Sequence, residues 1–103
     1  MIILGIETSC DETSAALVED GNKVHSNIVA SQQDLHSKFG GVVPEIACRA
    51  HTETIITVID KAVTEANIKM SDIDAISIAN TPGLIGALLI GLTAAKTLSW
   101  ILK

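Results

Sequence analysis

A long helical pattern followed by an apolar strand limits the fold of this 103-residue chain more than any other feature. Pro44 and Glu45 suit the first turn of a helix, and Asn67 suits a left-handed residue at its end, with Ile68 folding back on the last turn. Between them, apolar residues recur every three to five positions over about six turns: Ile46, Ala50, Ile55, Ile59, Ala62, Val63 and Ala66. Such a helix can connect two parallel strands.

Strand-like segments lie on both sides of this helix. Residues 74–79 are almost wholly apolar, as expected for a strand that is covered on both faces. Before the helix, polar turns separate three β-rich segments and predict an antiparallel meander: residues 2–6, 13–18 and 23–31. Residues 32–41 are polar, end in two glycines and are expected to form a loop. The predicted order is β-β-β-α-β-α with a mixed sheet, an α/β fold.

The last helix, residues 84–102, is strongly apolar. Lys96 interrupts its apolar stretch after about a dozen residues, whereas a membrane span needs ~20, so we expect a buried helix rather than a membrane segment. Ala87, Gly91 and Ala95 recur at i, i+4 and form a stripe of small residues along it. Two interpretations remain open: the stripe packs on the chain's own sheet, or it is an interface with another chain.

Composition excludes several classes of protein. A formal net charge of −5 and only two aromatic residues, Phe39 and Trp100, do not suit a domain that binds nucleic acid by itself. Cys10 and Cys48 are far apart in sequence and fit neither a zinc knuckle nor a disulfide scaffold, so we expect reduced thiols and a cytoplasmic protein. The first residues lack the basic region of a signal peptide.

The polar segment between the first two strands carries the chemistry. Thr8, Ser9 and Thr13 offer hydroxyls, while Asp11 and Glu12 offer carboxylates. Such a turn, together with its backbone amides, can hold a phosphate through a metal ion or water shell. The alternative is an ordinary hairpin, because Ser, Thr and Asp are common in turns. The matching strands on either side favour a nucleotide-phosphate loop.

Four segments resemble one family within the actin-like ATPase superfamily: residues 5–13, 40–47, 49–51 and 82–91. They are similar to TsaD, the tRNA threonylcarbamoyladenosine biosynthesis proteins, historically labelled Gcp or O-sialoglycoprotein endopeptidase. The resemblance extends over essentially the whole chain. It implies an actin-like, ribonuclease H-like half-domain, with residues 1–103 as the N-terminal part of the first subdomain and the second domain absent.

The resemblance implies a reaction and roles for residues. Family members transfer a threonylcarbamoyl group from threonylcarbamoyl-adenylate to the adenosine beside the anticodon of tRNA. Asp11 and Glu12 match acidic positions that face the transferred group and are the candidate catalytic residues. Ser9 and Thr8, with Thr13, are the candidate phosphate-binding residues, and Glu7 matches the strand-end acid of the superfamily.

The resemblance also implies a divalent metal, iron or zinc, held by a His-x-x-x-His pair and a later Asp, and a bound adenylate in the full-length family. The chain stops at Lys103, before that pair is expected, so we expect this chain alone to be inactive and to hold no metal or other cofactor. His25, His36 and His51 show no ligand spacing, and lone histidines usually fill cores or surfaces. No His-Glu-x-x-His pattern or nucleophile elbow supports a peptidase.

The expected partners are a TsaB-like paralogue docked on the helices, a TsaE-like ATPase, and tRNA only as part of the full complex, with no membrane. The isolated chain is expected to form a homodimer through its helices. One departure concerns Thr81, where family members carry a glycine before Pro82 and Gly83. If that position needs a positive φ, threonine strains the loop by ~1–3 kcal/mol.

Three functions remain open at this point: a segment of the tRNA-modifying transferase, a non-catalytic TsaB-like interaction paralogue, and another actin-like enzyme such as a sugar or acyl-phosphate kinase. The acidic residues 10–12 favour the first over the second, because an interaction paralogue needs no charge in that turn. A His-x-x-x-His pair farther along the gene would separate the first from the third.

Overall fold

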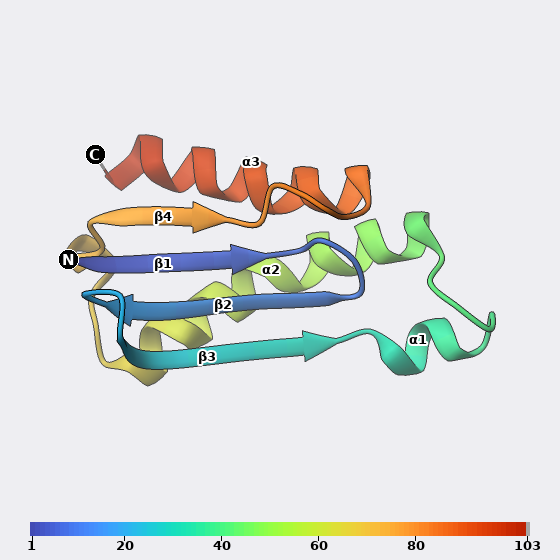
Figure 1. Ribbon diagram of the computed structural model, residues 1–103, viewed down its shortest axis with the longest axis horizontal. Helices are drawn as coiled ribbons and strands as arrows, with labels where there is room; N and C mark the ends of the chain where they lie inside the picture. The colour runs from blue at the N-terminus through green and yellow to red at the C-terminus, as the bar shows by residue number, and fades with distance from the viewer. Residues whose placement is uncertain (103) are drawn as a thin grey trace.

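A computed structural model describes residues 1–102 as a four-stranded sheet with two long helices (Figure 1). The predicted order of the main elements is confirmed, with ends within one or two residues of the expected ones. The elements are β1 (Ile2–Glu7), β2 (Glu12–Glu19), β3 (Lys23–Ser31), α1 (Gln33–Ser37), α2 (Pro44–Ala66), a 3₁₀ turn (Met70–Asp72), β4 (Ala75–Ile78) and α3 (Ile85–Leu102).

The sheet is mixed, with strand order β3-β2-β1-β4. β1 pairs antiparallel with β2, from Ile2 opposite Glu19 to Glu7 opposite Ser14. It pairs parallel with β4, with Ile3 opposite Ala75, so α2 lies in the crossover between two parallel strands as predicted. The β2–β3 turn uses Asp20 and Gly21 at φ 53° and 76°, values that favour a tight hairpin.

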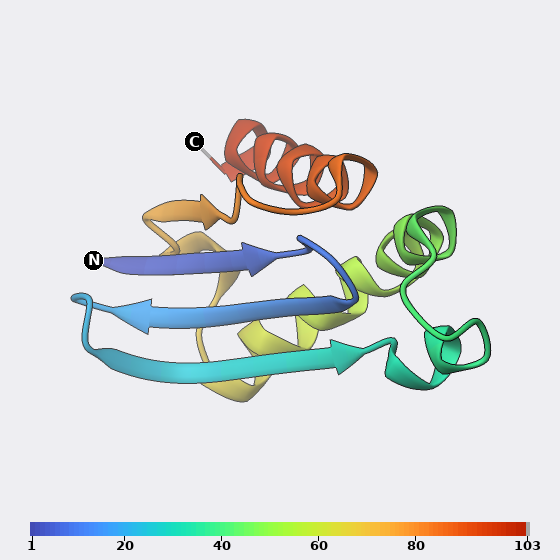
Figure 2. The same cartoon turned by 45° about the vertical axis from the view of Figure 1, so that its right-hand side comes forward.

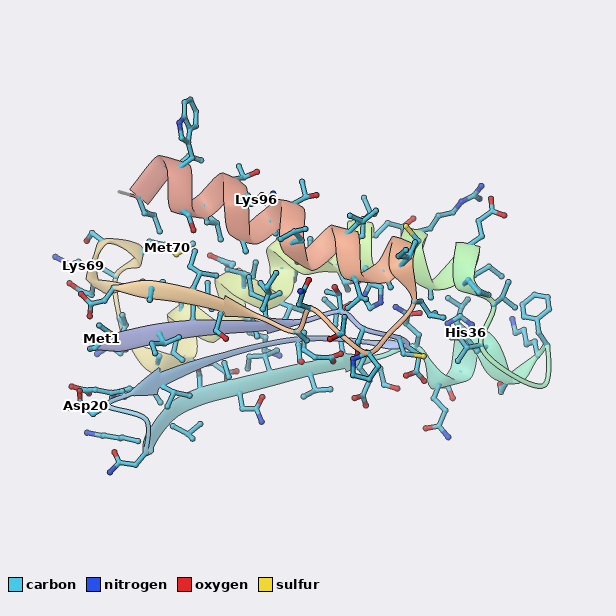
Figure 3. All side chains as sticks on the ribbon, turned by 45° about the horizontal axis from the view of Figure 1, so that its top comes forward. Met1, Asp20, His36, Lys69, Met70 and Lys96 are labelled. Atoms are coloured by element: carbon cyan, nitrogen blue, oxygen red, sulfur yellow. The ribbon has the colours of Figure 1, made fainter. Side chains whose placement is uncertain are left out.

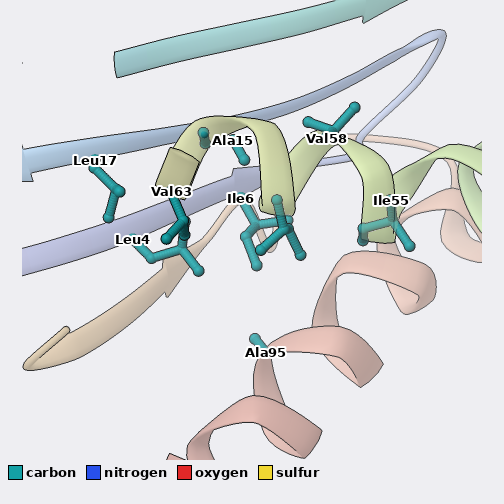
Figure 4. Packing of buried hydrophobic residues seen from close by; sticks show 10 residues of the cluster. Leu4, Ile6, Ala15, Leu17, Ile55, Val58, Val63 and Ala95 are labelled. Carbon is teal, nitrogen blue, oxygen red and sulfur yellow. The ribbon is translucent and has the colours of Figure 1, made fainter. Parts of the chain in front are cut away.

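The hydrophobic core lies between one face of the sheet and both long helices. Alternate residues of β1 and β2, among them Leu4, Ile6 and Leu17, point to this face and are buried. Helix α2 packs over β2 and β3, while α3 packs beside it over β4 and β1 (Figure 2). Ala95 of α3 faces the same cluster as Val58 and other residues of α2 (Figure 4).

The ends of α2 follow the sequence signals. Pro44 occupies the first turn, where its missing N–H leaves no helical hydrogen bond unmade. Asn67 ends the helix at φ 56°, and its N–H donates to the carbonyl of Thr64 at 3.1 Å. The N–H of Ile68 reaches the Val63 carbonyl at 3.4 Å, as in a Schellman motif.

The loop predicted over residues 32–41 contains a short helix, α1, which that prediction missed. Buried His36 holds it in place: its Nε2 lies 2.7 Å from Oε1 of Gln32, and its Nδ1 lies 3.2 Å from the Val43 N–H. A five-residue helix is too short to show an apolar period in the sequence. The hydrogen bonds of His36 that hold the helix are visible only in the structure. Figure 3 shows His36 at the opposite end of the molecule from Met1 and Asp20, whose ammonium and carboxylate pair at 2.8 Å.

The small-residue stripe of α3 packs on the chain's own sheet, so of the two interpretations of the stripe the structure favours this one over the interface for which the three residues were candidates. Ala87, Gly91 and Ala95 are the buried residues of α3. The hydroxyl of Thr8, at the end of β1, donates to the Ala87 carbonyl at 2.6 Å and accepts from the Gly91 N–H at 3.1 Å. Thr8 thus enters the hydrogen-bond ladder of α3, and only small residues allow that approach.

The expectation that the last helix is buried holds for this one face of α3. Large apolar side chains on its other faces are exposed, including Ile85, Leu89 and Trp100. The uncovered apolar surface of α3 therefore lies away from the stripe.

The close approach at Gly91 predicts a strong effect of one added methyl group. A Cβ at this position would lie 2.7 Å from Oγ1 of Thr8, whereas a Cβ at Gly86, in the same helix, would meet the Cys48 sulfur at an ordinary 3.6 Å. We expect Gly91→Ala to lower the free energy of unfolding by about 1–3 kcal/mol. The control Gly86→Ala should raise it by up to about 1 kcal/mol through helix propensity.

Urea unfolding followed by circular dichroism measures both changes. Equal stability of the two variants would show that Thr8 does not constrain α3.

Candidate functional site

The candidate site is the turn between β1 and β2, at the end of the sheet where both long helices begin (Figure 1). Three neighbours hold this turn: residues 80–84 before α3, the first turns of α2, and Gln32 after β3. Each makes a hydrogen bond to one of its residues. The turn is thus fixed by parts of the chain that are distant in sequence.

Glu7 and Ser9 form the first part of the turn. The N–H of Ser9 donates to Oε1 of Glu7 at 2.7 Å, and the Ser9 hydroxyl donates to the same oxygen. The strand-end acid therefore fixes the direction of the chain as it leaves β1, in the manner of a side chain that caps a turn.

The segment before α3 closes on Ser9 from the other side. The Leu84 N–H donates to the Ser9 carbonyl at 2.7 Å. A Cβ at Gly83 would lie 2.6 Å from that carbonyl oxygen, so only glycine allows the approach. Thr81 is absent from the residues with positive φ in the described range 1–102, so the left-handed strain considered for it does not arise.

His51 of α2 holds the second part of the turn. Its ring is completely buried, at 0% exposure. Nε2 lies 2.9 Å from the Cys10 carbonyl oxygen, and Nδ1 lies 2.7 Å from Oγ1 of Thr13. The sequence pattern indicated no partner for His51. Its position one turn before Ile55, on the apolar face of α2, could have indicated a buried ring, and a buried polar ring needs hydrogen-bond partners.

The two candidate catalytic carboxylates are the polar side chains of the turn that have no internal partner in the described part of the chain. Glu12 is exposed and Asp11 is half-buried, and neither carboxylate makes a hydrogen bond or ion pair with another residue in the range 1–102. The Asp11 carbonyl accepts from the Gln32 N–H at 2.9 Å, so its backbone is held while its side chain stays free. Partial burial raises the pKa of the neighbouring Cys10 thiol, and the charges of Asp11 and Glu7 raise it further.

The candidate phosphate-binding hydroxyls are occupied inside the protein. Thr8 and Thr13 are each 1% exposed and bond to Ala87 and His51, as described above. The Ser9 hydroxyl is bonded to Glu7 but lies in a part-buried position. The structure therefore gives the Thr8 and Thr13 hydroxyls internal partners, whereas phosphate binding was predicted for them; Thr13 lies on the core-facing side of β2.

Residues 1–102 contain no group of three His, Cys, Asp or Glu side chains that could hold a metal ion. The three histidines have separate partners: His25 pairs with Glu19 at 2.8 Å, His36 with Gln32, and His51 with the turn. The described residues do not by themselves form the iron or zinc centre that the resemblance implies for the full-length family.

Helix α3 has the length and apolar composition that a membrane-spanning helix would need. Core helices of soluble proteins meet the same criteria, and here one face of α3 packs on the sheet.

Comparisons with known proteins identify the family. The family model for TsaD, tRNA N6-adenosine threonylcarbamoyltransferase, matches residues 23–103. Proteins of that name from Protochlamydia amoebophila and Staphylococcus haemolyticus are 58% and 60% identical over 103 and 99 residues, which are 100% and 96% of this chain. The chain spans only 30% and 29% of their lengths.

Among solved structures, YeaZ from Pseudomonas aeruginosa superposes with a TM-score of 0.70 at 22% identity, over 98% of this chain and 39% of that one. At this identity the likeness shows the fold alone, and it supports the predicted actin-like, ribonuclease H-like architecture. The family match and the high identity of the curated relatives together establish that this chain belongs to the TsaD family.

Proposed function

We propose that this chain supplies the adenylate-facing turn of a tRNA-modifying transferase. The reaction moves a threonylcarbamoyl group from threonylcarbamoyl-adenylate to the adenosine beside the anticodon of tRNA. The observation that carries the proposal is the turn itself: its backbone and hydroxyls are held internally, while the carboxylates of Asp11 and Glu12 stay open. Because the chain spans about 30% of its relatives' length, other parts of those proteins complete the reaction.

The surroundings of the turn suit the phosphate of an adenylate. Helices α2 and α3 both begin at this end of the sheet, and helix N-termini carry partial positive charge and unpaired N–H groups (Figure 1). Leu84, just before α3, is bonded directly to Ser9. With Thr8 and Thr13 turned inward, we assign phosphate binding to backbone N–H groups and to Ser9, if its hydroxyl leaves Glu7.

Asp11 and Glu12 suit the other end of the substrate. Ionised carboxylates only accept hydrogen bonds, and the threonylcarbamoyl group offers N–H and O–H donors. The pair would orient that group for attack by the adenosine amine, and correct orientation supplies a large part of enzymatic rate enhancement. Family membership favours this role over that of a sugar or acyl-phosphate kinase.

We further propose that the surface between α2 and α3 binds the helices of another protein, a TsaB-like paralogue in the complete assembly and a second copy in the isolated chain. A groove of about 610 Å³ separates the two helices, lined mainly by apolar side chains such as Ile59, Ile90 and Leu98. Ile56 and Ile101 on its edges are 73% and 64% exposed. Exposed apolar patches of this kind mark interaction sites.

The proposed role of the carboxylates predicts a loss of transfer without a loss of fold. In a full-length family member that carries this segment, Asp11→Asn and Glu12→Gln should each lower kcat by about 100-fold or more, because the transferred group loses its orientation. Asp20→Asn makes the same chemical change at the other end of the sheet and should leave kcat unchanged. Normal transfer by both turn variants would reduce the turn to a structural hairpin.

The Cys10 thiol provides a direct probe of the Asp11 charge. Burial is the main cause of its raised pKa and the Asp11 carboxylate adds to it, so Asp11→Asn should lower the pKa of Cys10 and leave more thiolate at a given pH. In a Cys48→Ala background, the rate of alkylation by iodoacetamide between pH 7 and 10 should therefore rise at lower pH in this variant. An unchanged pH profile would place the carboxylate away from the thiol.

The groove predicts self-association of the isolated chain. Sedimentation velocity at increasing concentration should show a dimer, and Ile56→Lys should weaken it by about tenfold or more, because a charge would be buried in an apolar contact. Val29→Lys is the matched control, since Val29 is exposed on β3 and does not line the groove. A chain that stays monomeric at several hundred micromolar, or equal effects of both lysines, would contradict the proposal.

A further inference from the structure

His51 is a fully buried polar group to which the proposed function gives no task. It lies on α2, far in sequence from the turn, yet both of its ring nitrogens bond to the turn or to the residue that follows it. Its partners are Cys10, just before the acidic pair, and Thr13, just after it. One imidazole ring therefore bridges the two ends of the segment that carries Asp11 and Glu12.

The partners also fix the proton on the ring. The Cys10 carbonyl oxygen can only accept a hydrogen bond, so Nε2 must carry the hydrogen at the 2.9 Å contact. In the neutral ring, Nδ1 is then an acceptor, and the Thr13 hydroxyl donates to it across 2.7 Å. Both nitrogens and the hydroxyl are satisfied in this arrangement, as buried polar groups require.

The acidic pair is held at further points. Gln32 donates its backbone N–H to the Asp11 carbonyl at 2.9 Å, and its side-chain amide reaches the Ala47 carbonyl of α2 at 3.4 Å. Cys10 and Asp11 are thus tied to α2 through their carbonyls and Thr13 through its hydroxyl, directly or through one residue. The side chains of Asp11 and Glu12 are the part of this segment that remains free to meet a substrate.

We infer that His51, as the neutral Nε2–H tautomer, is the positioning residue for the carboxylates of Asp11 and Glu12. The inference rests on the proposed function, because it assumes that these carboxylates meet the transferred group. His51 touches no reacting atom. It acts by holding both ends of the acidic segment, and a displacement of about 1 Å in such a group can lower a rate by about 100-fold.

The two hydrogen bonds can be removed separately. The amide of Gln can replace Nε2 and donate to Cys10, whereas that of Asn can replace Nδ1 and accept from Thr13. Each substitution keeps one contact and loses the other, so each should release one end of the segment. Thr13→Val removes the same hydroxyl contact from the opposite side, and Thr13→Ser retains it.

The tautomer is tested first, in the 103-residue chain and without any assay of activity. Long-range ¹H–¹⁵N spectra distinguish a ring nitrogen that carries hydrogen from one that does not. The buried His36 also has an acceptor, Gln32 Oε1, at its Nε2 and a donor, the Val43 N–H, at its Nδ1, so the two rings must be assigned separately. The inference expects His51 to carry hydrogen on Nε2 only, and expects the signals of His51, but not those of His36, to shift in Thr13→Val. A His51 ring with hydrogen on Nδ1, or with both nitrogens protonated at neutral pH, would overturn it.

Kinetics of the full-length protein test the positioning role. His51→Gln and Thr13→Val should lower kcat by about 10- to 100-fold with a much smaller change in KM for the adenylate, and Thr13→Ser should retain more activity than Thr13→Val. His25→Gln, a histidine change at the remote Glu19 pair, should have no effect. Rates are compared well below each Tm, so that loss of folded protein does not contribute.

These results distinguish failure of the positioning role of His51 from failure of the proposed function of the turn. If Asp11→Asn lowers kcat but His51→Gln and Thr13→Val do not, the positioning role is wrong and the proposed function stands. If Asp11→Asn and Glu12→Gln also leave kcat unchanged, the proposed function fails. The tautomer spectra still report whether His51 makes its hydrogen bonds to Cys10 and Thr13.

Discussion

The position of the whole candidate site depends on the hydrogen bonds of Thr8 with α3. Its hydroxyl takes part in the helix ladder between Ala87 and Gly91, which brings the end of β1 against the first half of α3. This contact places the segment before α3 over Ser9, where Gly83 and Leu84 close on the turn. An added methyl at Gly91 would separate the two elements, and the geometry of the turn would change with them.

The same arrangement divides the polar groups of the turn into two sets. Hydroxyls that point to the core complete buried hydrogen bonds, because an unpaired buried group would cost about 1–3 kcal/mol. The carboxylate of Glu12 is exposed, that of Asp11 is half-buried, and neither has a partner within residues 1–102. A rigid backbone with free acceptors is what orientation of a substrate requires. We therefore propose a positioning role for the carboxylates and a structural one for Thr8 and Thr13.

Much of this could be predicted from the sequence. Periodicity and caps predicted α2, including the left-handed Asn67, and the resemblance indicated the family. The roles of Thr8, Thr13 and the α3 stripe could not be assigned, because the side of an element that faces the core is known only once its partners are known. His51 was missed for the same reason: its partners lie 38 and 41 positions away, and local patterns do not contain such contacts.

The most direct test is a crystal structure of a full-length family member carrying this segment, bound to a stable analogue of threonylcarbamoyl-adenylate. The account predicts carboxylate oxygens of Asp11 or Glu12 about 2.6–3.2 Å from N–H or O–H groups of the threonylcarbamoyl moiety. It also predicts that Thr8 and Thr13 keep their bonds to Ala87 and His51. Carboxylates turned to bulk solvent, with the phosphate on the hydroxyls of Thr8 and Thr13, would contradict it.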